Sequence, residues 1–119
     1  MSTGGRLRQL VVEEDINGVT IVNFAHTKIL DEQNIAQLGD ELTSLVDGPR
    51  KILLNFQNVE YMSSSAIGKF TALLKLVTAA KGKIRICSIG PTITEIFKIT
   101  RLNKLFDIHK DEQAALDRF

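Results

Sequence analysis

A run of six residues near the middle of the chain, Lys-Ile-Leu-Leu-Asn-Phe at 51–56, constrains the fold more than any other stretch. Its apolar residues do not alternate with polar ones, which is typical of a strand covered on both faces. Such strands occur in mostly parallel sheets, where strands alternate along the chain with helices that cover the sheet. The run therefore predicts an α/β fold with this segment at the centre of the sheet.

The N-terminal part predicts an antiparallel hairpin followed by a helix. Residues 9–15 and 19–24 have strand character, and the Asn17-Gly18 pair between them favours a two-residue turn. Apolar residues at helical spacing then predict a helix that starts after Asp31 as the N-cap. This helix should end near residue 46, before an Asp-Gly-Pro sequence.

The remaining elements alternate between helix and strand. We expect Ile84 and Ile86 on one face of a strand and Cys87 on the other. The buried side of the following helix should consist of Ile93, Ile96, Phe97 and Thr100, and Ala115 and Leu116 should point inward from a terminal helix. The predicted elements are a helix from the serines to about 81–82, a strand at 83–88, a helix from Pro91, an edge strand at 105–108 and a helix at 111–119. The expected fold is a mixed, mostly parallel sheet of about five strands with an N-terminal antiparallel hairpin and about four helices.

Length and charge favour one domain over residues 1–119, with residues 1–8 as a loose leader. Fifteen basic and fourteen acidic residues give a formal charge of +1, which does not indicate a nucleic-acid-binding protein. No apolar run approaches the ~20 residues that span a bilayer, and the first eight residues lack an apolar signal region. We therefore expect a cytoplasmic protein with no membrane insertion and no direct contact with nucleic acid.

Three consecutive serines, Ser63, Ser64 and Ser65, lie where the central strand gives way to a helix. At such a turn the first backbone N–H groups have no partner within the helix, and the helix dipole is positive. Hydroxyl groups there can cap the helix, receive a phosphate or act as nucleophiles. Capping needs one serine only, so it accounts for the position of the run but not for its length.

The nucleophile alternative is poorly supported, and so are cofactor and metal sites. The chain has no Gly-Lys-Ser/Thr phosphate loop, and Tyr61 or Met62 stands where a Gly-x-Ser-x-Gly elbow needs its first glycine. The histidines, His26 and His109, fall in no motif, and Cys87 in an apolar strand is most simply a buried thiol. We expect no catalytic residue, no cofactor and no metal.

The predicted second helix has one face of small residues. At 100° per residue, Ser64 shares a face with Gly68, Ala72, Lys75 and Ala79, with Leu76 alongside. The core stripe of Ile67, Phe70, Leu73, Leu74 and Val77 points elsewhere. The small-residue face is either a docking surface or an ordinary solvated face that uses alanine for its helix propensity.

The chain resembles the STAS domain, the fold of bacterial anti-sigma factor antagonists, from about Leu10 to Leu116. The most specific segment is 52–68, Ile-Leu-Leu-Asn-Phe-Gln-Asn-Val-Glu-Tyr-Met-Ser-Ser-Ser-Ala-Ile-Gly, which is similar to the family's strand and Asp-Ser-Ser/Thr-Gly-Leu-Gly turn. Residues 82–91, 96–97, 102–108 and 29–31 resemble further family segments. Ser63 replaces the aspartate common in phosphorylated members, Ala66 replaces a glycine, and residues 26–28 (His-Thr-Lys) lack a common loop glycine.

The resemblance implies partner switching. The unmodified antagonist binds an anti-sigma factor that is also a serine kinase, phosphorylation of the antagonist releases it, and a serine phosphatase resets the cycle. The acceptor position falls on Ser64, with Ser65 and Ser63 as its neighbours. The partner-binding residues implied are Ser63, Ser64, Ser65, Gly68, Lys69, Ala72, Lys75 and Leu76. The alternative is a non-phosphorylated accessory subunit of a lipid-transport or stress-signalling complex, which Ser63 in place of aspartate fits equally well.

Overall fold

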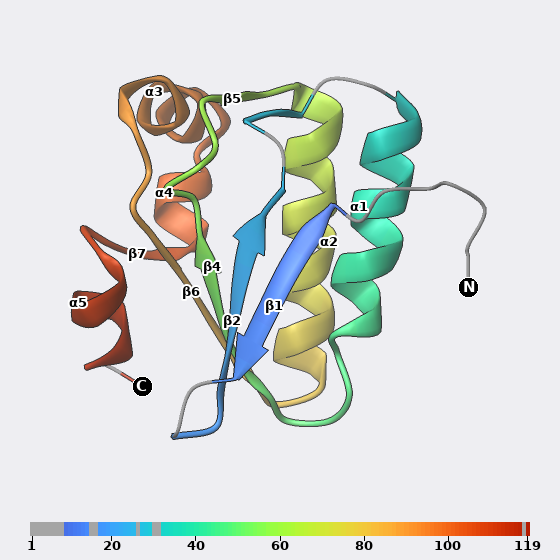
Figure 1. The fold of residues 1–119 in the computed structure, drawn as a ribbon, viewed down its shortest axis with the longest axis vertical. Helices are drawn as coiled ribbons and strands as arrows, with labels where there is room; N and C mark the ends of the chain where they lie inside the picture. Colours follow the sequence, from blue (N-terminus) through green and yellow to red (C-terminus); the bar gives the residue numbers. More distant parts are fainter. Residues whose placement is uncertain (1–8, 15–16, 26, 30–31, 118) are drawn as a thin grey trace.

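The computed structural model describes residues 9–14, 17–25, 27–29, 32–117 and 119. Within these residues a five-stranded sheet has the order β1-β2-β4-β6-β7 (Figure 1). Its strands are β1 (Leu10–Glu14), β2 (Val19–Phe24), β4 (Lys51–Asn55), β6 (Lys83–Cys87) and β7 (Asp107–His109). Only β1 and β2 are antiparallel, and the pairs β2–β4, β4–β6 and β6–β7 are parallel. The predicted mixed, mostly parallel sheet with an N-terminal hairpin is confirmed.

The described helices are α1 (Glu32–Ser44), α2 (Ser64–Ala79), α3 (Pro91–Thr100), α4 (Leu102–Leu105) and α5 (Glu112–Leu116). Helices α1 and α2 lie side by side behind the sheet in Figure 1, and α5 lies at the edge near β6 and β7. Two further strands, β3 (Lys28–Ile29) and β5 (Tyr61–Met62), pair in parallel next to the start of α2. This small pair holds the segment before α1 against the segment that leads into the serine turn.

The apolar run at 51–56 lies at the centre of the sheet because its side chains fill two cores. Ile52, Leu54 and Phe56 belong to the large core between the sheet and helices α1 to α3. Leu53 belongs to a smaller core on the opposite face, under α5. The buried amide of Asn55 is paired there, because its Nδ2 donates to Oε1 of Glu112 at 2.9 Å.

Four phenylalanine rings join the sheet to the helices. The ring of Phe56 lies 4.9 Å from that of Phe24, 5.4 Å from that of Phe70 and 5.8 Å from that of Phe97, measured between centroids. These rings come from β2, α2, α3 and the residue that follows β4. Edge-to-face contacts at this spacing favour defined orientations, so they help to set where α2 and α3 lie relative to the sheet.

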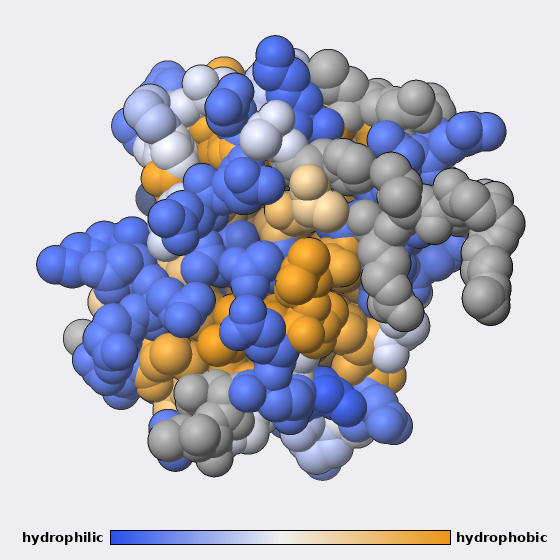
Figure 2. Space-filling view, in the orientation of Figure 1, coloured by the Kyte–Doolittle hydropathy of each residue, from blue (hydrophilic) through white to orange (hydrophobic). Residues whose placement is uncertain are grey.

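The front face of the sheet is covered less completely than the rear. Figure 2 shows hydrophobic side chains gathered near the middle of this face, around β1 and β2, among hydrophilic ones. On the edge strand β1, Val11 and Val12 are exposed, and Glu13 and Glu14 follow them. Charged residues on an edge strand disfavour pairing with other chains.

The predicted edge strand at 105–108 is wrong in part. Arg101 has a left-handed backbone (φ 63°), which ends α3 and lets the chain form the short helix α4. Leu105 is the last residue of that helix, and β7 begins only at Asp107. A left-handed arginine carries no sequence signal, since glycine or asparagine normally marks such positions.

Other boundaries and one side chain also differ from the prediction. The terminal helix covers Glu112–Leu116 only, and Asp111 is its cap, with Oδ1 accepting from the Ala114 amide at 2.9 Å. Thr100 is exposed rather than buried, and its hydroxyl donates to the Ile96 carbonyl at 2.7 Å. The central strand ends at Asn55, α1 at Ser44 and α2 at Ala79, each one to three residues earlier than predicted. The predicted leader at 1–8, the cap Asp31 and His26 lie outside the described residues.

Candidate functional site

Ser63 caps α2. Its backbone is extended (φ −79°, ψ 165°), and its Oγ accepts a hydrogen bond from the Ala66 amide at 3.4 Å. The Ser63 amide donates to the Ile29 carbonyl at 3.0 Å, so strand β3 holds the cap in place. The predicted capping role therefore lies on Ser63, whose side chain is half-buried.

Ser64 and Ser65 are the first two residues of α2, and both are exposed. Their amides belong to the first turn, which has no acceptors within the helix. No acidic residue lies in that turn, so nothing in it offsets the positive end of the helix dipole. A negatively charged group on either hydroxyl would be favourably placed.

The outward face of α2 is formed as predicted, but Leu74, predicted in the core stripe, is only half-buried and lines a hollow. The residues predicted on this face are all exposed: Ser64, Gly68, Ala72, Lys75, Leu76 and Ala79. The buried residues of the helix are Ala66, Ile67, Phe70, Leu73 and Val77. Gly68 has open space above it, since a Cβ added there meets no atom within 4 Å. The structure thus brings most of the predicted partner-binding residues together on one smooth surface.

Lys69 differs from the other predicted binding residues because it leans onto α1. A Cβ added at Gly39 would lie 2.9 Å from Cδ of Lys69, so the lysine stem crosses directly over that glycine. The side chain is half-buried as a result. Its aliphatic part packs between two helices, and only its amine end remains available to a partner.

A hollow of about 200 Å³ lies beside Ser64, between α2, β5 and α3. Its lining residues are Tyr61, Met62, Ser64, Ile67, Ile96, Ile99 and Thr100. Sequence reasoning missed the contribution of α3. The available signal was Ile99, an isoleucine off the predicted buried side of that helix, which is 79% exposed.

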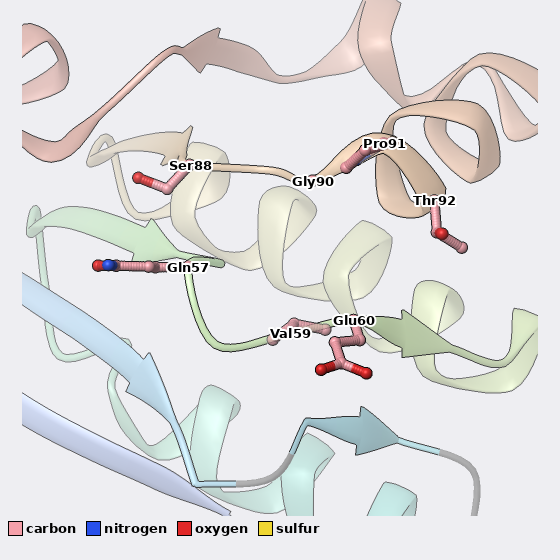
Figure 3. Close-up of a pocket in the computed structure, with 7 residues that line it drawn as sticks. All are labelled: Gln57, Val59, Glu60, Ser88, Gly90, Pro91 and Thr92. Carbon is pink, nitrogen blue, oxygen red and sulfur yellow. The ribbon is translucent and has the colours of Figure 1, made fainter.

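A second hollow, of about 360 Å³, opens at the carboxyl ends of β4 and β6 (Figure 3). Its polar side chains are Gln57, Glu60, Ser88 and Thr92, and the first turn of α3 closes one side. Figure 3 shows Ser88 near Gln57, with Glu60 farther along the hollow near Val59. The hollow includes none of the three serines of the run, and its polar set contains neither a histidine nor a basic residue.

The other reactive side chains lie away from the serines. Burial raises the pKa of the Cys87 thiol, and the carboxylates of Glu112 and Asp111 raise it further against a lowering hydrogen bond with Ser88. His109 contacts Asp107 and Arg85, with its Nε2 3.3 Å from Oδ1 of the aspartate. Among the described residues no cluster of histidine, cysteine and carboxylate side chains could hold a metal ion, and no helix is long and apolar enough to cross a membrane.

Comparison with known proteins gives consistent matches. The STAS domain model matches residues 11–115. The anti-sigma-B factor antagonist of Staphylococcus aureus strain NCTC 8325 is 32% identical over 104 residues, which cover 84% of this chain and 96% of that protein.

Two solved structures share the fold. An anti-sigma-factor antagonist (STAS) domain protein from Planctomyces limnophilus has a TM-score of 0.82 at 22% identity, over 93% of this chain and 97% of that one. The Bacillus cell fate determinant SpoIIAA in its phosphorylated form has a TM-score of 0.67 at 17% identity, over 92% of this chain and 97% of that one.

Proposed function

Because the chain belongs to the STAS domain family, we propose that it is an anti-sigma factor antagonist that acts by partner switching. The observation that carries the proposal is the exposed hydroxyl of Ser64 at the start of α2, above a smooth face of small residues. The 32% identical relative is named as an anti-sigma-B factor antagonist, which supports the same function here. The partner is an anti-sigma factor, bound in the cytoplasm through the outward face of α2.

Phosphorylation of Ser64 is the proposed control. A phosphate adds about −1.5 to −2 charges at neutral pH, and the first-turn amides, which have no acceptors within the helix, and the dipole of α2 accommodate that charge without unfolding the helix. SpoIIAA, which shares this fold, exists in an unphosphorylated and a phosphorylated form. The kinase is the anti-sigma factor itself, and a serine phosphatase reverses the step, so the cycle needs no catalysis by this chain.

Ser64 is favoured over its two neighbours. Ser63 is half-buried and its hydroxyl is engaged in the cap, where the aspartate of other family members would also accept from the helix. Ser65 is exposed, but it lies 100° around the helix from Ser64 and off the smooth face. Because serine and aspartate can both accept a hydrogen bond from the first turn, serine can replace aspartate at position 63 with little loss of local structure.

Incubation with the cognate anti-sigma factor kinase and ATP, followed by mapping of phosphate by mass spectrometry, tests the site. We expect phosphate on Ser64 and none in the Ser64→Ala variant. Phosphate found only outside residues 63–65 would contradict the assignment.

Replacing Ser64 with aspartate should weaken binding of the anti-sigma factor by about tenfold or more, since a negative charge would enter the surface on which the partner docks. The thermal midpoint should hardly change, because an acidic residue in the first turn suits the helix dipole. Calorimetric titration and thermal unfolding measure the two quantities. Ser64→Asn, of similar size and neutral, is the matched control. Binding as tight as that of the wild type would rule out the switch.

A second candidate function is that of an accessory subunit in a lipid-transport or stress-signalling complex. The observation in its favour is Ser63. Because serine stands where phosphorylated family members carry aspartate, the acceptor lacks a neighbouring negative charge that a kinase could recognise. Purification of the tagged protein from its own cells separates the two functions. Recovery of a transporter ATPase with no kinase would favour the accessory role.

A further inference from the structure

A third hollow, of about 460 Å³, lies farther along the same side of α2 as the hollow next to Ser64. Its lining residues are Thr71, Leu74, Lys75, Thr78 and Ala79 of α2 and Leu105 of α4. The α2 residues that line the two hollows are spaced three or four positions apart. Both hollows therefore lie along one stripe of the helix. The two hollows together are called the α2–α4 groove.

The α2–α4 groove gathers exposed apolar side chains. Six large hydrophobic side chains are exposed among the described residues, and three of them, Tyr61, Ile99 and Leu105, line this groove. Ile99 is 79% exposed and Leu105 is 55% exposed. Large apolar side chains concentrated in one concave place, rather than scattered singly, indicate a surface that binds something.

Basic residues outnumber acidic ones next to the groove. Residues 61–106 contain eight basic residues and one acidic residue, whereas the rest of the chain contains seven basic and thirteen acidic ones. The acidic residue, Glu95, lies 3.7 Å from the amine of Lys98. Lys75 lines the groove, and Arg101 and Lys104 are exposed next to lining residues. The net charge of +1 therefore conceals a basic segment, part of which borders the groove.

We propose that the α2–α4 groove binds an acidic amphipathic helix of the partner protein. From Ser64 to Thr78 the groove spans about 21 Å of α2, enough for about four turns of a docked helix. The apolar side of that helix covers Leu74, Ile99 and Leu105, and its carboxylates face the basic residues on the rim. This is recognition of a helix in a groove, in which a few apolar anchors are spaced three or four apart.

A concave apolar groove suits a helix better than it suits the two other acidic ligands of comparable size. A bilayer presents a nearly flat surface, which cannot fill a hollow between two helices. Nucleic acid offers phosphates to the rim, but it offers no aliphatic side chains to cover Ile99 and Leu105. The combination of apolar floor and basic rim therefore favours a protein segment.

The inference rests on the proposed function, because Ser64 and Lys75 belong both to the groove and to the proposed docking face of α2. It adds a reason why phosphorylation releases the partner. A phosphate on Ser64 stands at one end of the groove and repels the acidic helix there, at short range and within one Debye length. Release is then an electrostatic effect and needs no change in the fold.

The test measures the affinity of the cognate anti-sigma factor for groove variants by calorimetric titration. Leu105→Glu and the double variant Lys75→Glu/Lys104→Glu should each weaken binding by about tenfold or more. Val12→Glu, at another exposed apolar position, on β1, is the matched control and should bind like the wild type. Added salt should weaken binding by the wild type more than binding by the double lysine variant. Circular dichroism verifies that each variant is folded.

The outcomes separate the two proposals. If Ser64→Asp weakens binding while both groove variants bind like the wild type, the groove inference is wrong and the proposed function stands. If the wild type does not bind the anti-sigma factor, both are wrong.

Hydrogen exchange of the bound anti-sigma factor identifies the segment that occupies the groove. Protection of an amphipathic helix with net negative charge is expected, and protection of a basic or extended segment overturns the inference. Binding to phosphatidylglycerol vesicles that is lost in Leu105→Glu would assign the groove to a membrane and also overturn it.

Discussion

At the scale of single residues, three identical side chains have different surroundings. Ser63 is held by strand β3 and accepts from the Ala66 amide, whereas Ser64 and Ser65 project into solvent. The difference comes from position: the last residue before a helix has an extended backbone that turns its hydroxyl back towards the first turn. One position further on, the side chain points away from the helix start.

Replacing Ser63 with alanine should lower the free energy of unfolding by about 1 kcal/mol, because the Ala66 amide would lose its acceptor. Chemical denaturation measures this loss. The same change at Ser65, which is exposed and does not cap the helix, is the control and should be nearly neutral. An equal loss in both variants would mean that Ser63 contributes no specific cap.

Cys87 predicts a dependence of stability on pH. Burial raises the pKa of the thiol in the folded protein above its value in the unfolded chain, about 8.5. The folded state therefore keeps a proton that the unfolded state releases, so stability is complete below the unfolded pKa and falls as pH rises above it. Denaturation at neutral and at alkaline pH should show a decline in the wild type that is smaller in Cys87→Ala. The native thiol should also react slowly with thiol reagents until the protein unfolds.

At the scale of elements, α2 connects the core to the proposed partner surface. Its buried side packs on the sheet and on the phenylalanine rings, and its outward side combines small residues with the α2–α4 groove. Gly68 is in the middle of this helix, where glycine is destabilising by about 0.5–1 kcal/mol relative to alanine. No neighbouring atom in the structure requires the absence of a side chain there.

Gly68→Ala should therefore raise the free energy of unfolding by about 0.5–1 kcal/mol. Gly68→Gln should be close to neutral for stability but should weaken binding of the anti-sigma factor, since a long side chain would hold the partner away from α2. Denaturation and calorimetric titration measure the two effects. Gly48→Ala is a useful contrast and should be destabilising, because Gly48 has φ +80°. Unchanged binding by Gly68→Gln would exclude close approach at this point.

At the scale of the whole molecule, the main features are the cluster of four phenylalanine rings and the uneven distribution of charge along the chain. The rings join β2, the end of β4, α2 and α3 into the large core. Residues 61–106, which include α2 to α4, hold eight of the fifteen basic residues and one of the fourteen acidic ones. The core thus holds the helices in position, and under the proposed function the charge would attract an acidic partner to them.

Phe56→Ala should lower the free energy of unfolding by about 3–5 kcal/mol, as for other buried aromatic truncations. Phe56 is fully buried and its ring contacts three others, so no rearrangement of one neighbour can fill the space. Chemical denaturation gives the value, with Leu76→Ala at an exposed position as the control. A loss below about 1 kcal/mol would mean that the ring cluster is not what joins α2 and α3 to the sheet.

Local patterns in the sequence alone determined the class of fold and much of the site. Uniform apolar character identified the central strand, and Asn17-Gly18 indicated the antiparallel pair. The helical spacing of apolar residues distinguished the two sides of α2. The presence of a serine cap and the exposure of Ser64 follow from the same short-range geometry. Each of these features depends on residues within a few positions of one another, which is why the sequence was sufficient.

The tertiary structure decided the features that depend on distant residues. The strand order β1-β2-β4-β6-β7, the small β3–β5 pair and the α2–α4 groove each join segments that lie far apart in the chain. The left-handed Arg101, which ends α3 and places Leu105 in α4, is held against its own preference by the packing of Leu102 and Phe106 in the core. No periodicity or turn signal records such contacts, because their energy appears only when both segments are in place.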